Sequence, residues 1–110
     1  MEPGEAFTEA AVRETREETG LTIEDPRLCG VKQFQRSDGA RYVVFFYKAA
    51  RYHGNLHSSE EGEVFWASRE DLRRYQTVDD FENMVRVFDN GDLNEFYYYP
   101  ENGGWGLKLL

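Results

Sequence analysis

Three glutamates near the start of the chain, Glu14, Glu17 and Glu18, have a spacing that could support metal chemistry. On an α-helix, residues at i, i+3 and i+4 project from one face, so these carboxylates would lie within reach of a common point. A divalent cation would relieve their mutual repulsion, and all-oxygen ligation favours Mg²⁺, with Mn²⁺ as the alternative. Arg13 can pair with Glu17 at i+4 or orient a neighbouring carboxylate. The pattern therefore predicts a metal-binding helix face.

Acidic helix faces also have a simpler explanation. Charge runs are usually solvent-exposed surface, in which glutamate and arginine supply solubility and i,i+4 pairs. Composition alone favours a solvated surface. Whether the face binds metal is therefore judged from the spacing of residues in the wider segment.

The segment from Glu5 to Leu21, EAFTEAAVRETREETGL, resembles the Nudix box. The box pattern is Gly, five residues, Glu, seven residues, Arg-Glu, an aliphatic residue, any residue, Glu-Glu, any residue, Gly and an aliphatic residue. The chain meets this pattern with the following residues: Glu5, Arg13, Glu14, Glu17, Glu18, Gly20 and Leu21. So many fixed positions make the resemblance specific.

Two positions depart from the pattern. Thr15 stands where the family usually has a bulky aliphatic residue, which trims the buried side of the helix. The leading glycine would lie six residues before Glu5, ahead of Met1. We therefore expect a Nudix domain that lacks its N-terminal portion, and the departure concerns activity rather than ancestry.

The resemblance implies a role for each box residue. Glu17 and Glu18 would be the principal metal ligands, and Glu14 would share the metal site or act as the base. Arg13 would orient Glu14, and Glu5 would hold a metal-bound water or a second ion.

Many family members recruit a further glutamate from a loop before a later strand. Glu61 is the first choice for that role here, because it lies five residues ahead of Trp66, and Glu60 and Glu63 are alternatives. The three could equally form a solvated acidic loop.

Composition restricts the partners. The chain has 110 residues, enough for one domain spanning residues 1–110, and a net charge of −8. Without a basic stripe it is not expected to bind a nucleic-acid polymer, although small anions bridged by metal remain allowed. No run is long enough to span a membrane and no signal peptide precedes the box, so the expected location is cytoplasmic.

The cysteine and histidine side chains do not indicate a second metal site or a nucleophile. The single Cys29 has no disulfide partner and is expected in the core, while His53 and His57 lie in a polar loop and are expected to be solvated. Aromatic residues that could stack on a base, or simply fill the core, are Phe34, Phe45, Tyr47 and Trp66. The substrate-binding residues therefore stay unknown at this stage.

Hydrophobic periodicity and turn residues predict the order of elements. Helices are expected over Phe7–Thr19, from Ser68 onward, and over Thr77–Asn90. Strands are expected over Leu21–Ile23, Arg27–Gln35, Arg41–Lys48, Glu63–Trp66, Glu95–Tyr99 and Trp105–Leu110.

Three finer expectations follow from this order. Asp38-Gly39 predicts a tight turn between two strands, and 51–62 reads as a polar loop. The continuous apolar centre of Arg41–Lys48 predicts a central strand buried on both faces. The order indicates an α/β fold with a mixed sheet covered by helices on both sides, and the resemblance implies an α/β/α sandwich of the Nudix type, truncated at its N-terminus.

The resemblance also implies an activity: Mg²⁺-dependent hydrolysis of a diphosphate linkage in a nucleoside di- or triphosphate derivative. Similarity to bacterial members makes an oxidised-nucleotide (8-oxo-dGTP) diphosphatase the first choice, and an ADP-ribose or nucleotide-sugar pyrophosphatase the alternative. A non-catalytic nucleotide-binding remnant is the hypothesis from a different class. Missing strands would expose sheet edges, so a homodimer is a further expectation.

Overall fold

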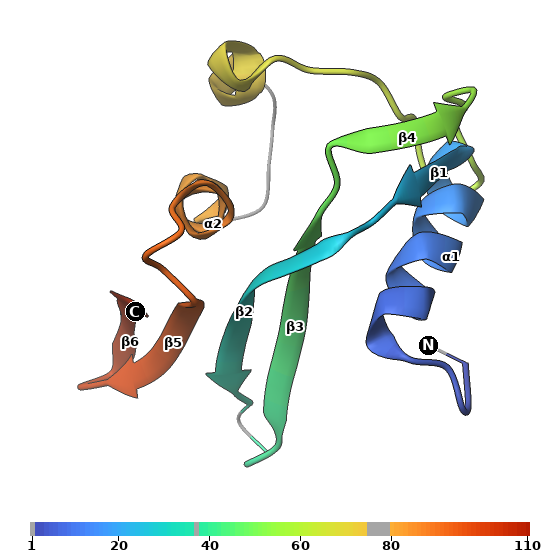
Figure 1. The fold of residues 1–110 in the computed structure, drawn as a ribbon. Coiled ribbons are helices and arrows are strands. Elements are labelled where there is room, and N and C mark those ends of the chain that lie inside the picture. Colours follow the sequence, from blue (N-terminus) through green and yellow to red (C-terminus); the bar gives the residue numbers. More distant parts are fainter. Residues whose placement is uncertain (1, 37, 75–79) are drawn as a thin grey trace. The chain divides into compact units, whose positions relative to one another are not determined.

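The computed structural model describes residues 2–36, 38–74 and 80–110 (Figure 1). These residues fall into two compact units. The first comprises Met1–Arg27 and Ala49–Val78, and the second comprises Leu28–Lys48 and Asp79–Leu110. All box residues and the loop with Glu61 belong to the first unit, so each unit is described by itself.

Helix α1, Phe7–Thr19, is the main element of the first unit and has the predicted bounds. Its start is fixed locally, because the Glu9 side chain accepts a hydrogen bond from the Ala6 backbone N–H at 2.9 Å. Its end is fixed by Gly20, which has a φ of 81° and donates its N–H to the Arg16 carbonyl. The helix therefore ends at a glycine, the residue that takes the left-handed conformation at least cost.

A two-stranded antiparallel sheet follows this helix. Strand β1, Leu21–Glu24, pairs with β4, Arg51–Gly54, so that Leu21 lies opposite Gly54 (Figure 1). The prediction of a loop over 51–62 was wrong for its first four residues. The segment carries no alternating apolar pattern, and its strand conformation comes from the ladder to β1 rather than from its own sequence.

Residues 63–66, predicted as a strand, have no strand conformation in the structure. The chain continues instead to a 3₁₀ helix, η1, Arg69–Arg74. Ser68 begins it as expected, since its hydroxyl and its carbonyl both accept the Asp71 N–H, at 3.2 and 3.1 Å. Val64, Phe65 and Trp66 favour a strand by composition, but a strand also needs a neighbouring strand to pair with.

The second unit contains a four-stranded sheet of order β3-β2-β5-β6. Its strands are β2, Arg27–Gln35; β3, Arg41–Lys48; β5, Glu95–Glu101; and β6, Gly104–Leu109. Strands β2 and β5 run parallel, whereas β5 and β6 run antiparallel, so the sheet is mixed. The predicted mixed sheet and α/β class are confirmed.

Strand β3 corrects one expectation. It ends the sheet rather than lying at its centre, and Tyr42 and Val43 are exposed while Phe46 is buried. A continuous apolar run is compatible with burial on both faces but does not determine how many neighbours the strand has.

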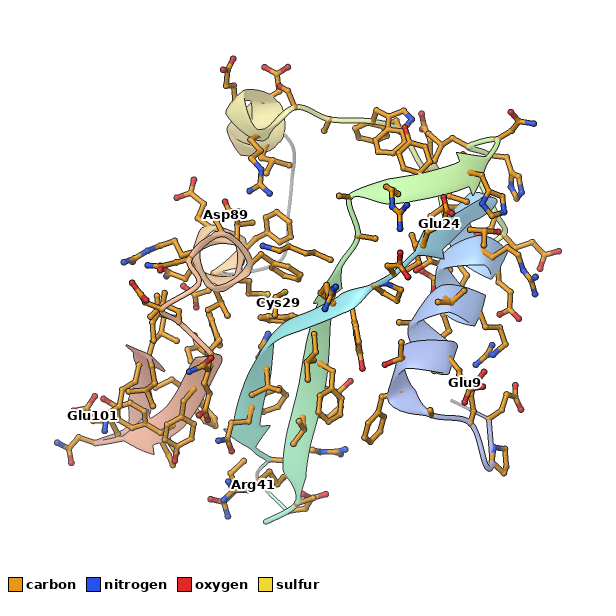
Figure 2. All side chains as sticks on the ribbon, in the orientation of Figure 1. Glu9, Glu24, Cys29, Arg41, Asp89 and Glu101 are labelled. Carbon is orange, nitrogen blue, oxygen red and sulfur yellow. The ribbon has the colours of Figure 1, made fainter. Side chains whose placement is uncertain are left out.

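Helix α2, Phe81–Asp89, packs on this sheet. The predicted helix over Thr77–Asn90 is confirmed from residue 81, and residues 77–79 lie outside the described part. Met84 and Val87 are buried against Phe96 of β5, with Val87 and Phe96 each 1% exposed. Cys29, labelled on β2 in Figure 2, packs at the edge of this core and donates to the Phe46 carbonyl, as a core cysteine would.

No helix within the described residues is both long enough and apolar enough to cross a membrane.

Candidate metal centre

Arg13 organises the exposed face of α1. Its Nε and Nη2 donate to the two carboxylate oxygens of Glu5 at 2.8 and 3.1 Å, a two-point contact that fixes both side chains. Its Nη1 donates to both oxygens of Glu17, at 3.1 and 3.2 Å, and Nη2 lies 3.5 Å from Glu14 Oε1. One guanidinium thus touches three box carboxylates.

Glu5 is the most strongly held of these three acids. Its Oε1 also accepts the Glu2 backbone N–H at 3.0 Å, and its side chain is 14% exposed. Hydrogen bonds from Arg13, and next from the Glu2 backbone, lower the pKa of the Glu5 carboxyl from 4.5 to about 2. The same pairing, first with Glu5 and then with Glu17, raises the pKa of Arg13. Glu5 is therefore engaged as a partner of the arginine.

Glu18 has the opposite electrostatics. Its pKa is raised, first by partial desolvation, then by the negative charge of Glu61 and a hydrogen bond with that residue, and then by Glu14 and Glu17. Glu61, the first choice among the loop glutamates, therefore lies close to Glu18 on the helix. Two acids from separate segments thus lie together.

Local structure explains why Glu61 reaches the helix. The loop begins at the end of β4, which is hydrogen-bonded to the strand directly after α1. The His57 N–H donates to the Thr19 carbonyl at 2.8 Å, which ties the loop to the last turn of the helix. Ser59 and Gly62 then exchange backbone hydrogen bonds at 3.2 Å, so Glu61 lies at the tip of a closed turn.

The described residues contain no group of three His, Cys, Asp or Glu side chains already converged on one point. Glu5 and Glu17 are turned toward Arg13, which leaves Glu18 and Glu61 as the carboxylates that face each other. Mg²⁺ is commonly bound by one or two protein carboxylates, with water and substrate phosphates completing its shell. The Glu18–Glu61 pair fits an ion held in this way better than it fits a closed cage of protein ligands.

The Arg13–Glu5 contact makes a pH-dependent prediction. Because the folded pKa of Glu5 lies below its ordinary value, its contribution to stability is present above pH 4.5 and is lost as the pH falls toward 2. Arg13→Gln is expected to return the Glu5 pKa toward 4.5, measured by the carboxyl ¹³C shift in an NMR titration. Arg16→Gln, on the same helix, should leave it at about 2. A wild-type Glu5 that titrates near 4.5 would contradict the contact.

The aromatic side chains named from the sequence divide between the units. In the first unit, Trp66 is 62% exposed and packs on Tyr52 of β4, with ring centroids 5.3 Å apart. In the second unit, Phe34 stacks on Tyr42 at 5.0 Å. Trp66 is therefore not a core residue of its unit, and the structure assigns none of these rings to a substrate.

Sequence reasoning missed two contacts at this site. Arg13 was expected to orient Glu14, yet its shortest contact is with Glu5, eight residues earlier and outside the helix. His57 is exposed, as expected, but the sequence did not predict that its backbone N–H holds the loop on the helix end. The helical i,i+4 rule could find the Arg13–Glu17 pair, but both missed contacts depend on where non-helical segments fold back.

Comparison with known proteins identifies the family. Residues 1–88 match the family model described as NUDIX domain, so the chain belongs to the Nudix hydrolase family. A relative, described as an uncharacterized Nudix hydrolase, YvcI, of Bacillus subtilis (strain 168), is 34% identical over 101 residues. The match covers 87% of this chain and 58% of the relative, so the chain spans little more than half of that protein's length.

A solved structure shares the fold. The mutator MutT protein from Bacillus halodurans superposes with a TM-score of 0.75 and 26% sequence identity. The match covers 98% of this chain and 77% of that chain. The family predicted from the box is therefore confirmed by sequence and by fold.

Proposed function

We propose that this chain, as a single Nudix domain over residues 1–110, hydrolyses a diphosphate linkage in a nucleoside di- or triphosphate derivative. The observation that carries the proposal is the approach of Glu61 to Glu18 on the box helix, with Glu14 and Glu17 adding negative charge beside them. Acids gathered in this way are unfavourable by themselves, and they become favourable when they share a divalent cation.

Glu18 and Glu61 would hold the ion, which we take to be Mg²⁺, with Mn²⁺ as a substitute. Such an ion supplies charge neutralisation for the phosphates and activation of the attacking water. Glu14 would complete the metal site or accept a proton from that water. Glu17 is 59% exposed beside Arg13, so it can turn toward the ion when the phosphates arrive.

Arg13 has a separate task in this proposal. By holding Glu5 and Glu17 while lying 3.5 Å from Glu14, it restricts how these acids can move and offsets part of their charge. Glu5, already ionised and engaged, would act through Arg13 or through a water rather than as a direct ligand.

The substrate we propose is an oxidised nucleoside triphosphate of the 8-oxo-dGTP kind. Two observations support it: the likeness of the middle and C-terminal sequence to bacterial Nudix proteins of that description, and the structural likeness to a mutator MutT protein. Neither the base nor the leaving group is read from a contact in this chain, so the substrate needs a direct assay.

The test is turnover of a nucleotide panel with Mg²⁺, with products separated by ion-exchange chromatography. The panel holds 8-oxo-dGTP, dGTP, ADP-ribose and a nucleotide sugar, each with an EDTA control. We expect 8-oxo-dGTP to give the monophosphate and pyrophosphate, faster than dGTP and only with metal. Faster cleavage of ADP-ribose or the sugar nucleotide would replace the substrate but keep the reaction. Metal-independent turnover, or none with any compound, would contradict the proposed function.

A further inference from the structure

His57 attaches the loop that carries Glu61 to the end of the box helix. We propose that His57 is a positioning residue that fixes Glu61 opposite Glu18 and thereby sets the affinity of the metal site. This inference rests on the proposed function, because it assigns a task to a residue outside the metal ligands. All the residues involved lie in the first unit.

The first contact is made by the backbone. The last carbonyls of a helix have no partner within the helix, and the His57 N–H takes up one of them by donating to Thr19 at 2.8 Å. Thr19 is the neighbour of Glu18 in the chain. The loop is therefore held directly beside the metal-site glutamate.

The second contact is made by the imidazole ring. Gly20 has no side chain, and the space that a Cβ would fill there lies less than 3.0 Å from the His57 ring and from the Asn55 carbonyl. The ring therefore lies against the backbone of Gly20, and its Nδ1 lies 3.2 Å from the Ser58 carbonyl. A backbone hydrogen bond alone would allow the loop to pivot, whereas the ring restricts its direction.

The remaining loop is short and internally bonded. Ser58 Oγ accepts the Val64 N–H at 2.9 Å, and Ser59 Oγ accepts the Glu61 N–H at 3.2 Å. With the Ser59–Gly62 backbone pair, these bonds hold the residues from His57 to Glu61 as one turn. A displacement at His57 is thus passed to Glu61 over only four residues.

An anchor of this kind is needed because the two carboxylates repel each other. When both carboxylates are ionised, their charges push Glu61 away from Glu18 before an ion binds, so an unanchored loop would move away and leave the ion with helix ligands only. Groups that orient metal ligands without touching the metal typically change affinity by about 10- to 100-fold. The effect of losing the His57 ring should fall in that range.

The experiment compares His57→Ala and His57→Phe with wild type, and uses His53→Ala as the matched control. His53 lies on β4, its side chain is 66% exposed, and its Nδ1 lies 3.9 Å from a Glu24 carboxylate oxygen. Three quantities are measured: Mn²⁺ affinity by water-proton relaxation, paramagnetic broadening of loop and helix amides by Mn²⁺, and the melting temperature without metal. Hydrogen exchange of the residue-57 amide reports the backbone contact independently of any metal.

We expect His57→Ala to weaken Mn²⁺ binding about 10-fold, near the lower end of that range, with little change in melting temperature. Mn²⁺ should still broaden helix amides around Glu18 but no longer those of 58–61. His57→Phe, which keeps a flat ring over Gly20, should retain most of the affinity, and His53→Ala should match wild type.

Unchanged Mn²⁺ affinity and loop broadening in His57→Ala would overturn the positioning role while leaving the proposed function in place. A His57→Phe variant as weak as His57→Ala would also overturn it, because ring packing would then not be the cause. If wild type itself bound no Mn²⁺, the metal site and the proposed function would fail together.

Discussion

Glu18→Gln is expected to lower Mg²⁺-dependent turnover at least about 100-fold, because the substitution removes a metal ligand rather than a group that supports one. Glutamine keeps the size of the side chain but loses the negative charge that binds the ion. Glu61→Gln should have a similar effect, since the two acids face each other. Turnover of the preferred nucleotide at saturating substrate measures both.

The same variant has a second expected result, opposite in sign. The pKa of Glu18 is raised in the folded state, so its contribution to stability is present below the ordinary pKa of 4.5 and is lost as the pH rises through the folded value. At pH 7, Glu18→Gln without metal should therefore melt no lower than wild type, while Mg²⁺ should no longer stabilise it.

Glu24→Gln is the control for both results, because Glu24 is an exposed glutamate on β1 (Figure 2) whose contact with His53 is 3.9 Å long. It should leave turnover and the Mg²⁺ effect unchanged. A Glu18→Gln protein that keeps its turnover would show that the acid pair is not the metal site. A variant that simply unfolds would contradict the electrostatic account of the site.

Gly20→Ala is expected to destabilise the fold by about 3 kcal/mol, from two separate causes. A left-handed backbone costs a residue with a Cβ about 1–2 kcal/mol, and Gly20 has a φ of 81°. Its Cβ would also overlap the His57 ring and the Asn55 carbonyl, and such overpacking costs about 1–3 kcal/mol. Urea unfolding in the absence of metal measures the change.

Gly103→Ala separates the two causes. Gly103 has the same φ of 81°, but a Cβ there would meet nothing within 4 Å, so only the backbone cost of about 1–2 kcal/mol applies. If both variants lose the same stability, the close packing of the loop on the helix end is absent in solution. A larger loss at Gly20 supports it.

The elements that sequence predicts well are those whose ends are set by local chemistry. The helix Phe7–Thr19 lies between a turn and a left-handed glycine, and the strands Arg27–Gln35 and Arg41–Lys48 flank a turn that contains Asp38-Gly39. Residues within a few positions of each boundary determine it, so the predicted bounds agree with the structure.

The failures depend on partners distant in the chain. Strand β4 is a strand because β1 lies beside it, and 63–66 is not a strand although its residues favour one. The edge position of β3 follows from the strand order β3-β2-β5-β6. In that order β2 pairs with β5, which comes from the C-terminal part of the chain. Local propensity contains none of this information.

The contacts of the candidate site also fall into those that local sequence predicts and those that it does not. Helical spacing places Glu14, Glu17 and Glu18 on one face, and it also gives the Arg13–Glu17 pair that the structure contains. The choice of Glu61 came from the family resemblance and stays a prediction, and Glu61 lies close enough to Glu18 to help raise the pKa of that residue. The contacts of Glu5 and His57 arise where the chain folds back on the helix, and no pattern in the sequence specifies them.

The measurement that tests the central claim most directly is Mn²⁺ binding to wild type, Glu61→Gln and Glu60→Gln, followed by electron paramagnetic resonance of the unbound ion. The two substitutions change the same charge at neighbouring positions, and Glu61 is close enough to Glu18 to raise its pKa. The account predicts that Glu61→Gln weakens binding at least about 10-fold, while Glu60→Gln binds like wild type. Equal affinities in all three proteins would contradict a metal site shared between the box helix and this loop.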